Sequence, residues 1–96
     1  MRFEWDLEKA EANYRKHQIR FERAIDVFSD PLHVIQFDRH IDDEDRFHAI
    51  GIVDDVLMLL VVHTLRFDHA GEVTRIISAR RATNTERKTY VKSNQH

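Results

Sequence analysis

The run Val56-Leu57-Met58-Leu59-Leu60-Val61-Val62 constrains the fold most, because seven successive residues are apolar without any polar alternation. A strand with one face in water alternates apolar and polar side chains, so this run predicts a central strand that is covered on both faces. It is far shorter than the roughly 20 residues of a membrane-spanning helix. The chain therefore needs two layers of cover around one strand.

Helical patterns precede this run. A first helix is predicted from the N-cap residue Asp6 to His17, because apolar residues recur there at helical spacing. A second is predicted over Arg20–Phe28 and is ended by Ser29-Asp30-Pro31. Its apolar stripe consists of Phe21, Ala24, Ile25 and Phe28.

Strand patterns fill most of the rest. The predicted strands are Phe3–Trp5, His33–Phe37, Arg46–Val53, Val56–Thr64 and Val73–Ala79. Polar turns are expected at Asp38–Asp45 and Phe67–Glu72, and Asp54-Asp55 is expected to close a hairpin. Thr83 and Glu86 form a capping box for a last helix that runs to about Lys92.

These elements predict an α+β fold, with two N-terminal helices on a mostly antiparallel sheet of four to five strands and a C-terminal helix. At 96 residues we expect one domain over residues 1–92 and a frayed tail at 93–96. The two first helices can cover one face of the sheet. Either the short last helix docks on the other face or a partner protein completes the core.

Charge is distributed unevenly along the chain. Residues 1–65 hold 8 Lys and Arg against 14 Asp and Glu, whereas residues 66–96 hold 7 against 3. A basic last third on an acidic body suggests an anionic partner for that third. The absence of cysteine fits a cytoplasmic protein.

The stretch Arg75–Thr83 reads as an apolar strand that runs into Arg80 and Arg81 and then into a helix cap. Permanent positive charge at a strand end beside a helix start suits a phosphate group. Arg75, in mid-strand, is equally able to pair with an acidic neighbour.

Several of these motifs resemble the BrnT family of bacterial type II toxins, a compact relative of the RelE-like ribonuclease toxins. The resemblance covers residues 3–90. The matching positions are Phe3-Glu4-Trp5-Asp6, Lys9-Ala10, Asn13, Lys16-His17, Ile19, Phe21, Ala24, Val27-Phe28, Asp30-Pro31, Glu44, Arg46, Gly51, Val61-Val62-His63-Thr64, Arg66, Arg75–Ala82, Glu86-Arg87 and Tyr90.

The resemblance implies a toxin that cleaves RNA and blocks translation, and we expect it to work without a metal ion or cofactor. It also implies a BrnA-type antitoxin with a ribbon-helix-helix DNA-binding domain, through which the complex binds operator DNA and represses its own operon. The alternative is a module that binds nucleic acid or antitoxin but does not cut. No membrane partner is expected.

Two positions depart from the family pattern. The family has Lys-His-Gly after the first helix, where this chain has Lys16-His17-Gln18. Gln18 must adopt a left-handed conformation at a cost of roughly 1 kcal/mol or end the helix differently. The second departure is Leu65, at a position where the family usually has a glutamate. If that carboxylate assists proton transfer in relatives, this chain lacks the group.

Metal-free RNA cleavage needs a base for the ribose 2′-hydroxyl, cations for the transition state and an acid for the leaving 5′-oxygen. The candidate catalytic residues are Arg46, Arg66, Arg80, Arg81, Lys16 and His17. For each arginine the competing interpretation is a surface ion pair, and for His17 it is a charge at a helix C-terminus. Glu44 is a further candidate base, and Tyr90 could stack on a base or pack on the sheet.

The arginines need not meet. In an antiparallel hairpin Arg46 and Arg66 fall at the same end of the sheet. Arg80 joins them if the last strand runs parallel to Val56–Thr64, and lies at the other end, near Asp54-Asp55, if the pairing is antiparallel. The sequence leaves both arrangements open.

Overall fold

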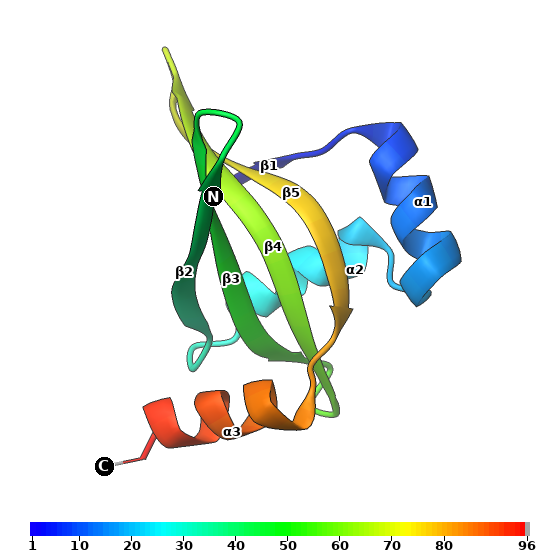
Figure 1. The fold of residues 1–96 in the computed structure, drawn as a ribbon, viewed down its shortest axis with the longest axis vertical. Helices are drawn as coiled ribbons and strands as arrows, with labels where there is room; N and C mark the ends of the chain where they lie inside the picture. Colours follow the sequence, from blue (N-terminus) through cyan, green and yellow to red (C-terminus); the bar gives the residue numbers. More distant parts are fainter. Residues whose placement is uncertain (96) are drawn as a thin grey trace.

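A computed structural model describes residues 1–95. Its elements, in chain order, are β1 (Arg2–Glu4), α1 (Leu7–His17), α2 (Phe21–Ala24), the 3₁₀ helix η1 (Ile25–Ser29), β2 (Val34–Ile41), β3 (Glu44–Val53), β4 (Leu57–Asp68), β5 (Gly71–Arg81) and α3 (Asn84–Ser93). The strands form one sheet in the order β1-β5-β4-β3-β2 (Figure 1). Only β1 and β5 pair in parallel, so the mostly antiparallel α+β fold predicted from the sequence is confirmed.

Strand β4 lies at the centre of the sheet, as the apolar run predicted. Leu59, Leu60 and Val61 are successive residues that point to alternate faces, and each is at most 1% exposed. The start of the run was predicted wrongly, because Val56 belongs to the turn after Asp54-Asp55 and is 80% exposed. Cover on both faces therefore begins only within β4.

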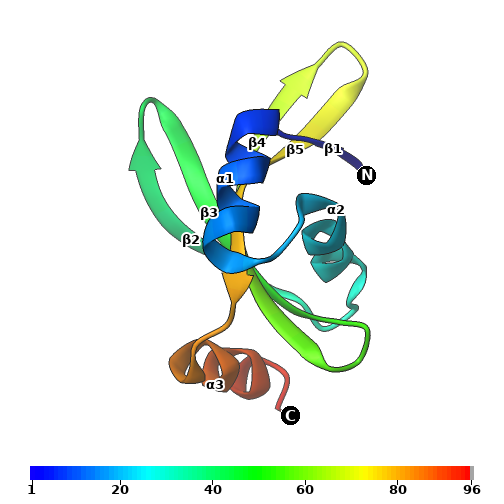
Figure 2. The same ribbon diagram turned by 90° about the vertical axis from the view of Figure 1, so that its right-hand side faces the viewer.

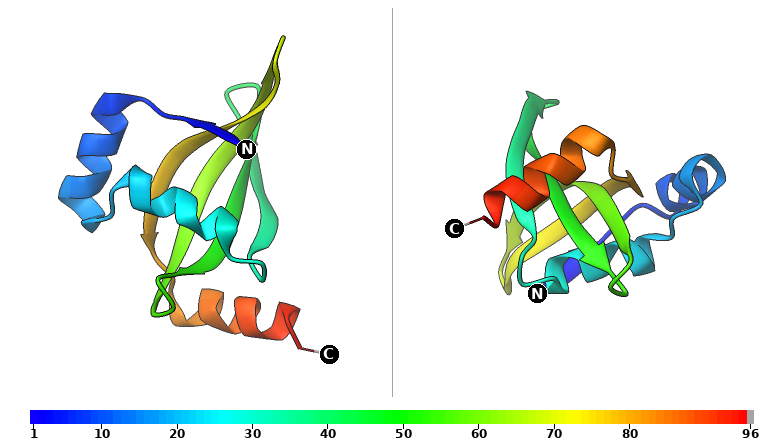
Figure 3. Two further views of the ribbon diagram at one scale, coloured as in Figure 1. Left: turned by 180° about the vertical axis from the view of Figure 1, so that it is seen from behind. Right: turned by 90° about the horizontal axis from the view of Figure 1, so that it is seen from below.

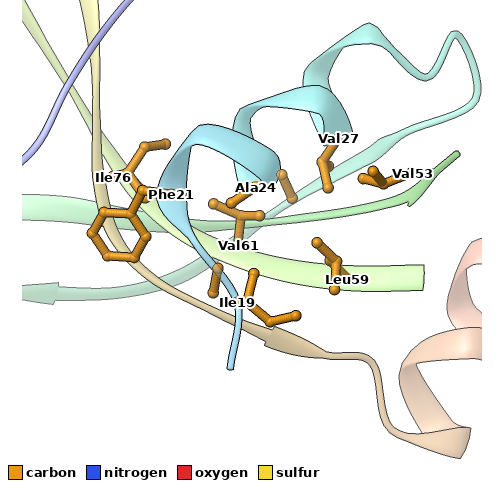
Figure 4. Packing of buried hydrophobic residues seen from close by; sticks show 10 residues of the cluster. Ile19, Phe21, Ala24, Val27, Val53, Leu59, Val61 and Ile76 are labelled. Carbon is orange, nitrogen blue, oxygen red and sulfur yellow. The ribbon is translucent and has the colours of Figure 1, made fainter. Parts of the chain in front are cut away.

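One face of the sheet, which we call the back face, is covered by α2 and η1 (Figure 3). Phe21, Ala24 and Val27 are fully buried there against β3, β4 and β5 (Figure 4). The single helix expected over Arg20–Phe28 is instead an α-helical turn followed by a 3₁₀ helix. The backbone passes very close to the sheet, since a Cβ on Gly51 would lie 2.9 Å from a methyl carbon of Val27.

The opposite face, which we call the front face and which Figure 1 shows toward the viewer, is covered at its lower end by α3. Tyr90 packs there on Ile50, Met58 and Leu60. Its hydroxyl donates to Asp30 over 2.7 Å, and the predicted capping box of Thr83 holds the start of the helix. Of the two expected arrangements, the C-terminal helix itself docks on this face.

Four strands are longer than predicted: β3 by two residues at its N-terminal end, β5 by two residues at each end, and β2 and β4 by four residues at their C-terminal ends. β2 continues through Asp38 to Ile41, so the expected turn Asp38–Asp45 shrinks to Asp42-Asp43, both with positive φ. β4 likewise continues to Asp68. The extra strand segments are mostly exposed and lack the apolar alternation that marks a half-buried strand. Of the expected frayed tail, Ser93 ends α3 and His96 lies outside the described residues.

Helix α1 lies beside the β5 edge of the sheet rather than across a face (Figure 2). Its predicted cap is confirmed, because the Asp6 side chain accepts a hydrogen bond from the Lys9 amide. The helix ends at Gln18, which adopts the left-handed conformation (φ 57°, ψ 28°) despite its side chain. No helix within residues 1–95 is both long and apolar enough to cross a membrane.

Candidate functional site

The front face changes character along its length. Its lower half in the view of Figure 1 is apolar and covered by α3. In its upper half, the strand register places Arg46, His48, Val62 and Ser78 next to one another on β3, β4 and β5. Paired residues of adjacent strands share a face. A β-bulge between β4 and β5, where Ile77 is the extra residue, brings both Ile77 and Ser78 to this side. The uncovered upper half of the front face therefore carries polar and basic side chains.

The buried side chain of Asn13 fixes α1 against this part of the sheet. Its amide nitrogen donates to the carbonyls of Ile19 (3.0 Å) and Ala79 (2.9 Å), and its oxygen accepts from the Ala79 amide (3.0 Å). β1 pairs only with the Val73–Arg75 part of β5. Asn13 thus takes the place of a strand partner further along the same edge, toward the C-terminal end of β5, and sets the position of α1.

A groove of about 380 Å³ lies between α1 and the sheet. Its charged and proton-exchanging lining residues are Lys9, Lys16, His17 and Arg46, and its lining includes no carboxylate. Lys16 and His17 come from the last turn of α1, Arg46 comes from β3, and Ser78 closes the floor from β5. The fold thus brings three of the six predicted catalytic residues together.

Arg46 carries an unsatisfied donor into this region. Its Nε atom is buried and has no hydrogen-bond partner among residues 1–95. The nearest carboxylate oxygen, on Glu44, lies 3.6 Å from Nη2. A buried donor without an acceptor costs about 1–3 kcal/mol, so the position of this guanidinium is maintained at the expense of stability.

Arg66 lies in a separate ion-pair network. It donates two hydrogen bonds to Glu4, which also accepts one from Arg75. The hydrogen bonds from Arg66, followed by that from Arg75, lower the pKa of Glu4 to about 2 although desolvation opposes them. The expected pairing of Arg75 with an acidic neighbour is confirmed, and Arg66 is neutralised by a carboxylate.

Arg80 and Arg81 separate to opposite faces. β5 pairs antiparallel with β4, which settles the alternative that the sequence left open: Arg80 pairs with Leu60, away from Arg66. The Arg80 guanidinium donates to both oxygens of Glu86 (2.7 and 2.9 Å), and this pairing lowers the pKa of Glu86 to about 2. Arg81 alternates to the back-face side and is exposed.

The sequence pattern assigned no catalytic role to Lys9 and Ser78, which line the groove, or to His48, which lies beside Arg46 on β3. Lys9 lies two helical turns before Lys16, so both share one face of α1. His48 follows Arg46 by two residues and therefore lies on the same face of β3, with Nε2 3.3 Å from an Asp38 oxygen. The spacings of Lys9 and His48 could have been used to predict that they share a face with Lys16 and Arg46. Ser78 reaches the groove only because of the bulge, which no spacing in the sequence indicates.

The other candidates have structural roles. Tyr90 is 6% exposed and packs on the sheet rather than presenting its ring to a ligand. Phe21 is a fully buried core residue, and Trp5 and Phe28 pack against that core, as expected.

Comparison with known proteins gives two findings. The family model described as "Ribonuclease toxin, BrnT, of type II toxin-antitoxin system" matches residues 5–86. The crystal structure of the Brucella abortus ribonuclease toxin BrnT superposes with a TM-score of 0.62 and 24% sequence identity, covering 88% of this chain and 99% of that chain. At this identity the superposition shows a shared fold. A search among curated protein sequences gives no match.

A small α+β domain with a cationic groove, matched over most of its length by a toxin family model, falls in the class of toxins of type II toxin–antitoxin systems. Within that class the chain belongs to the BrnT family of ribonuclease toxins. A type II toxin implies an antitoxin as its partner.

Proposed function

We propose that this protein is an endoribonuclease that binds an RNA phosphodiester in the groove between α1 and the front face. The observation that carries the proposal is the convergence of Lys9, Lys16, His17 and Arg46 on one groove whose lining includes no carboxylate. Phosphate contacts supply most of the affinity of nucleic-acid-binding proteins. The Arg46 side chain lines the groove and is 22% exposed, so its exposed part is available to a phosphate oxygen.

The proposed reaction is attack of the ribose 2′-oxygen on the adjacent phosphorus. A base removes the 2′-hydroxyl proton, the new P–O bond forms, the bond to the 5′-oxygen breaks, and an acid protonates that oxygen. The products are a 2′,3′-cyclic phosphate and a free 5′-hydroxyl. Every atom is supplied by the RNA and by side-chain protons, so the step balances without a metal ion or cofactor.

Roles follow from the chemistry of the groove residues. Arg46 and Lys16 stabilise the extra negative charge on the pentavalent phosphorus, because positioned cations act most strongly where charge develops. His17 is assigned a proton transfer, because histidine exchanges protons readily near neutral pH. His48 is a second candidate for the other proton. Arg80 and Arg66 are assigned structural ion pairs, in contrast to the catalytic roles predicted for them.

The proposed cellular role follows the family. RNA cleavage in the cytoplasm would block translation, and a BrnA-type antitoxin with a ribbon-helix-helix domain would neutralise the toxin and carry the complex to operator DNA. The family description "type II toxin-antitoxin system" supports this arrangement.

The test is cleavage of a single-stranded RNA by purified protein in the presence of EDTA. We expect products that end in a 2′,3′-cyclic phosphate. An oligonucleotide with 2′-deoxyribose throughout should bind and stay intact. Arg46→Gln and Lys16→Ala should each reduce kcat/KM at least about a hundredfold, the magnitude typical for loss of a group that stabilises the transition state.

The matched controls are Arg39→Gln, which removes the arginine that pairs across the strands from Arg46, and Arg15→Ala, which removes the neighbour of Lys16 on α1. Both should retain activity within a few fold. If well-folded wild-type protein binds RNA without cutting it, the assignment passes to the binding-only module. Full activity of Arg46→Gln would show that the groove is not the catalytic site.

A further inference from the structure

The back face holds a second surface of opposite character. Beyond the end of η1 this face is uncovered, and its side chains are apolar: Ile35 and Phe37 on β2, and Leu65 and Phe67 on β4 are 42–72% exposed. Register pairing joins these strands through Phe47, whose ring lies 6.0 Å from Phe37 and 5.8 Å from His63. We call Ile35, Phe37, Phe47, Leu65 and Phe67 the apolar patch.

The patch contains a hollow of about 190 Å³. Its walls include Phe28, Phe47 and Leu65, and its polar lining includes Thr74 and His63. The Thr74 hydroxyl is buried and has no hydrogen-bond partner among residues 1–95. Burial also lowers the pKa of His63, which favours its neutral form. The hollow thus offers mostly apolar walls around a volume that suits a single large apolar side chain.

Charge decides which partner fits. The patch contains no Lys or Arg, and Glu72 lines the hollow, so a phosphate backbone is repelled here and attracted to the groove on the other face. Glu72 also pairs across the strands with Phe67 and so lies at the edge of the patch. A second copy of this chain would bring the same carboxylate to the interface, whereas a segment with basic flanks would pair with it.

We propose that the apolar patch is the docking surface of the antitoxin, which places a large apolar side chain in the hollow and basic residues beside Glu72. The inference rests on the proposed function, because it takes the antitoxin of a type II toxin as the partner. Exposed apolar patches rimmed by polar groups mark protein interaction sites. Strand β2 is also an edge strand, so its free backbone groups are open to an extended segment.

The test measures the affinity of purified protein for the purified product of the adjoining reading frame, by isothermal titration calorimetry. Phe37→Ser and Phe67→Ser change side chains that are 61% and 72% exposed, so both should fold normally. Each should weaken binding at least about thirtyfold, the range of an interface anchor. Glu72→Lys should weaken it through charge reversal.

The matched controls are Val56→Ser and Val91→Ser, which remove exposed valines outside the patch. Both should bind the antitoxin within about twofold of wild type, and melting curves should match for all variants. RNA cleavage by free Phe37→Ser and Phe67→Ser should equal that of wild type. If the wild-type protein does not cleave RNA, the proposed catalysis is overturned. The docking proposal would still be tested, because binding of the antitoxin is measured directly.

Three results would overturn the docking proposal. The patch variants could bind the antitoxin as tightly as wild type. Light scattering could show a dimer of the free protein that Phe37→Ser abolishes, which would assign the patch to a second copy. Finally, the patch variants could lose affinity for a non-cleavable RNA, which would assign the surface to nucleic acid.

Discussion

Replacing Asn13 with alanine should destabilise the domain strongly, because three buried hydrogen bonds depend on this side chain. A typical internal hydrogen bond contributes about 0.5–1.5 kcal/mol net, so three give a loss of about 1.5–4.5 kcal/mol. The Ala79 amide and carbonyl would also be left unpaired on a residue that is fully buried. We therefore expect a loss of about 3 kcal/mol.

The assay is urea unfolding of Asn13→Ala against wild type, with Glu11→Ala on the exposed side of α1 as the control. In thermal melts of the same variants, each kcal/mol of lost unfolding free energy should lower the Tm by about 4–8 °C. Asn13→Asp tests the geometry further. Its carboxylate can still accept from the Ala79 amide but loses both donations and repels two carbonyls, so it should be no more stable than Asn13→Ala at neutral pH.

Asn13→Ala should also reduce RNA cleavage, because it releases α1 from its position beside the groove. In conditions where Asn13→Ala is folded, RNA cleavage should fall, and it should fall much less when Lys16 is already alanine, because the two changes act on the same wall of the groove. A loss of stability under 1 kcal/mol, or cleavage losses that simply add, would refute the reasoning that Asn13 positions α1.

Three further predictions concern stability. Asp30 accepts hydrogen bonds from the amides of Leu32 and Ile52 and from the Tyr90 hydroxyl; burial would raise its pKa, but these bonds outweigh burial and lower it. Asp30→Asn should cost about 2–4 kcal/mol in urea unfolding, and Tyr90→Phe should cost clearly less in that background than alone. Additive costs would contradict the coupling. Gly51→Ala should cost about 1–3 kcal/mol, because its Cβ would lie 3.0 Å from the Val27 carbonyl oxygen; an unchanged Tm would show that η1 can shift freely. The pKa of Glu86 is lowered to about 2 by Arg80, so its stabilising pairing is fully present above the unfolded-state pKa near 4.3 and is lost as pH falls toward 2. Glu86→Gln should flatten the stability profile between about pH 5 and pH 2, and an unaltered profile would rule out this pairing.

Local chemistry explains which elements the sequence predicts well. The Asp6 cap, the Thr83 capping box and the turn at Asp54-Asp55 each depend on neighbouring residues alone, and all three are present. The extension of β2 past Asp38 depends on pairing with β3, and no periodicity marks it. The same holds for the 3₁₀ winding of η1, where the close approach at Gly51 is a tertiary contact.

The sequence predicted which types of residue form the candidate site better than it predicted which of them lie together. Lys16, His17 and Arg46 were identified from the sequence, but their convergence requires α1 to lie along the β5 edge, which Asn13 secures through Ala79. The carboxylates that neutralise Arg66 and Arg80 come from β1 and α3. Glu4 in particular reaches Arg66 only because β1 pairs in parallel with β5.

The bulge at Ile77 decides which arginine faces the same side as the groove. Side chains alternate along a strand, and Arg75 lies on the front face, so an unbroken strand would place Ala79 and Arg81 in front and Ser78 and Arg80 behind. The extra residue inverts this order. It buries Ala79 completely in the back-face core, where an arginine would not fit, and brings Ser78 to the groove. Only a small side chain fits at position 79. A slip of one residue would place Arg80 in this buried position without a partner for its charge, so the burial of Ala79 fixes the register of β5.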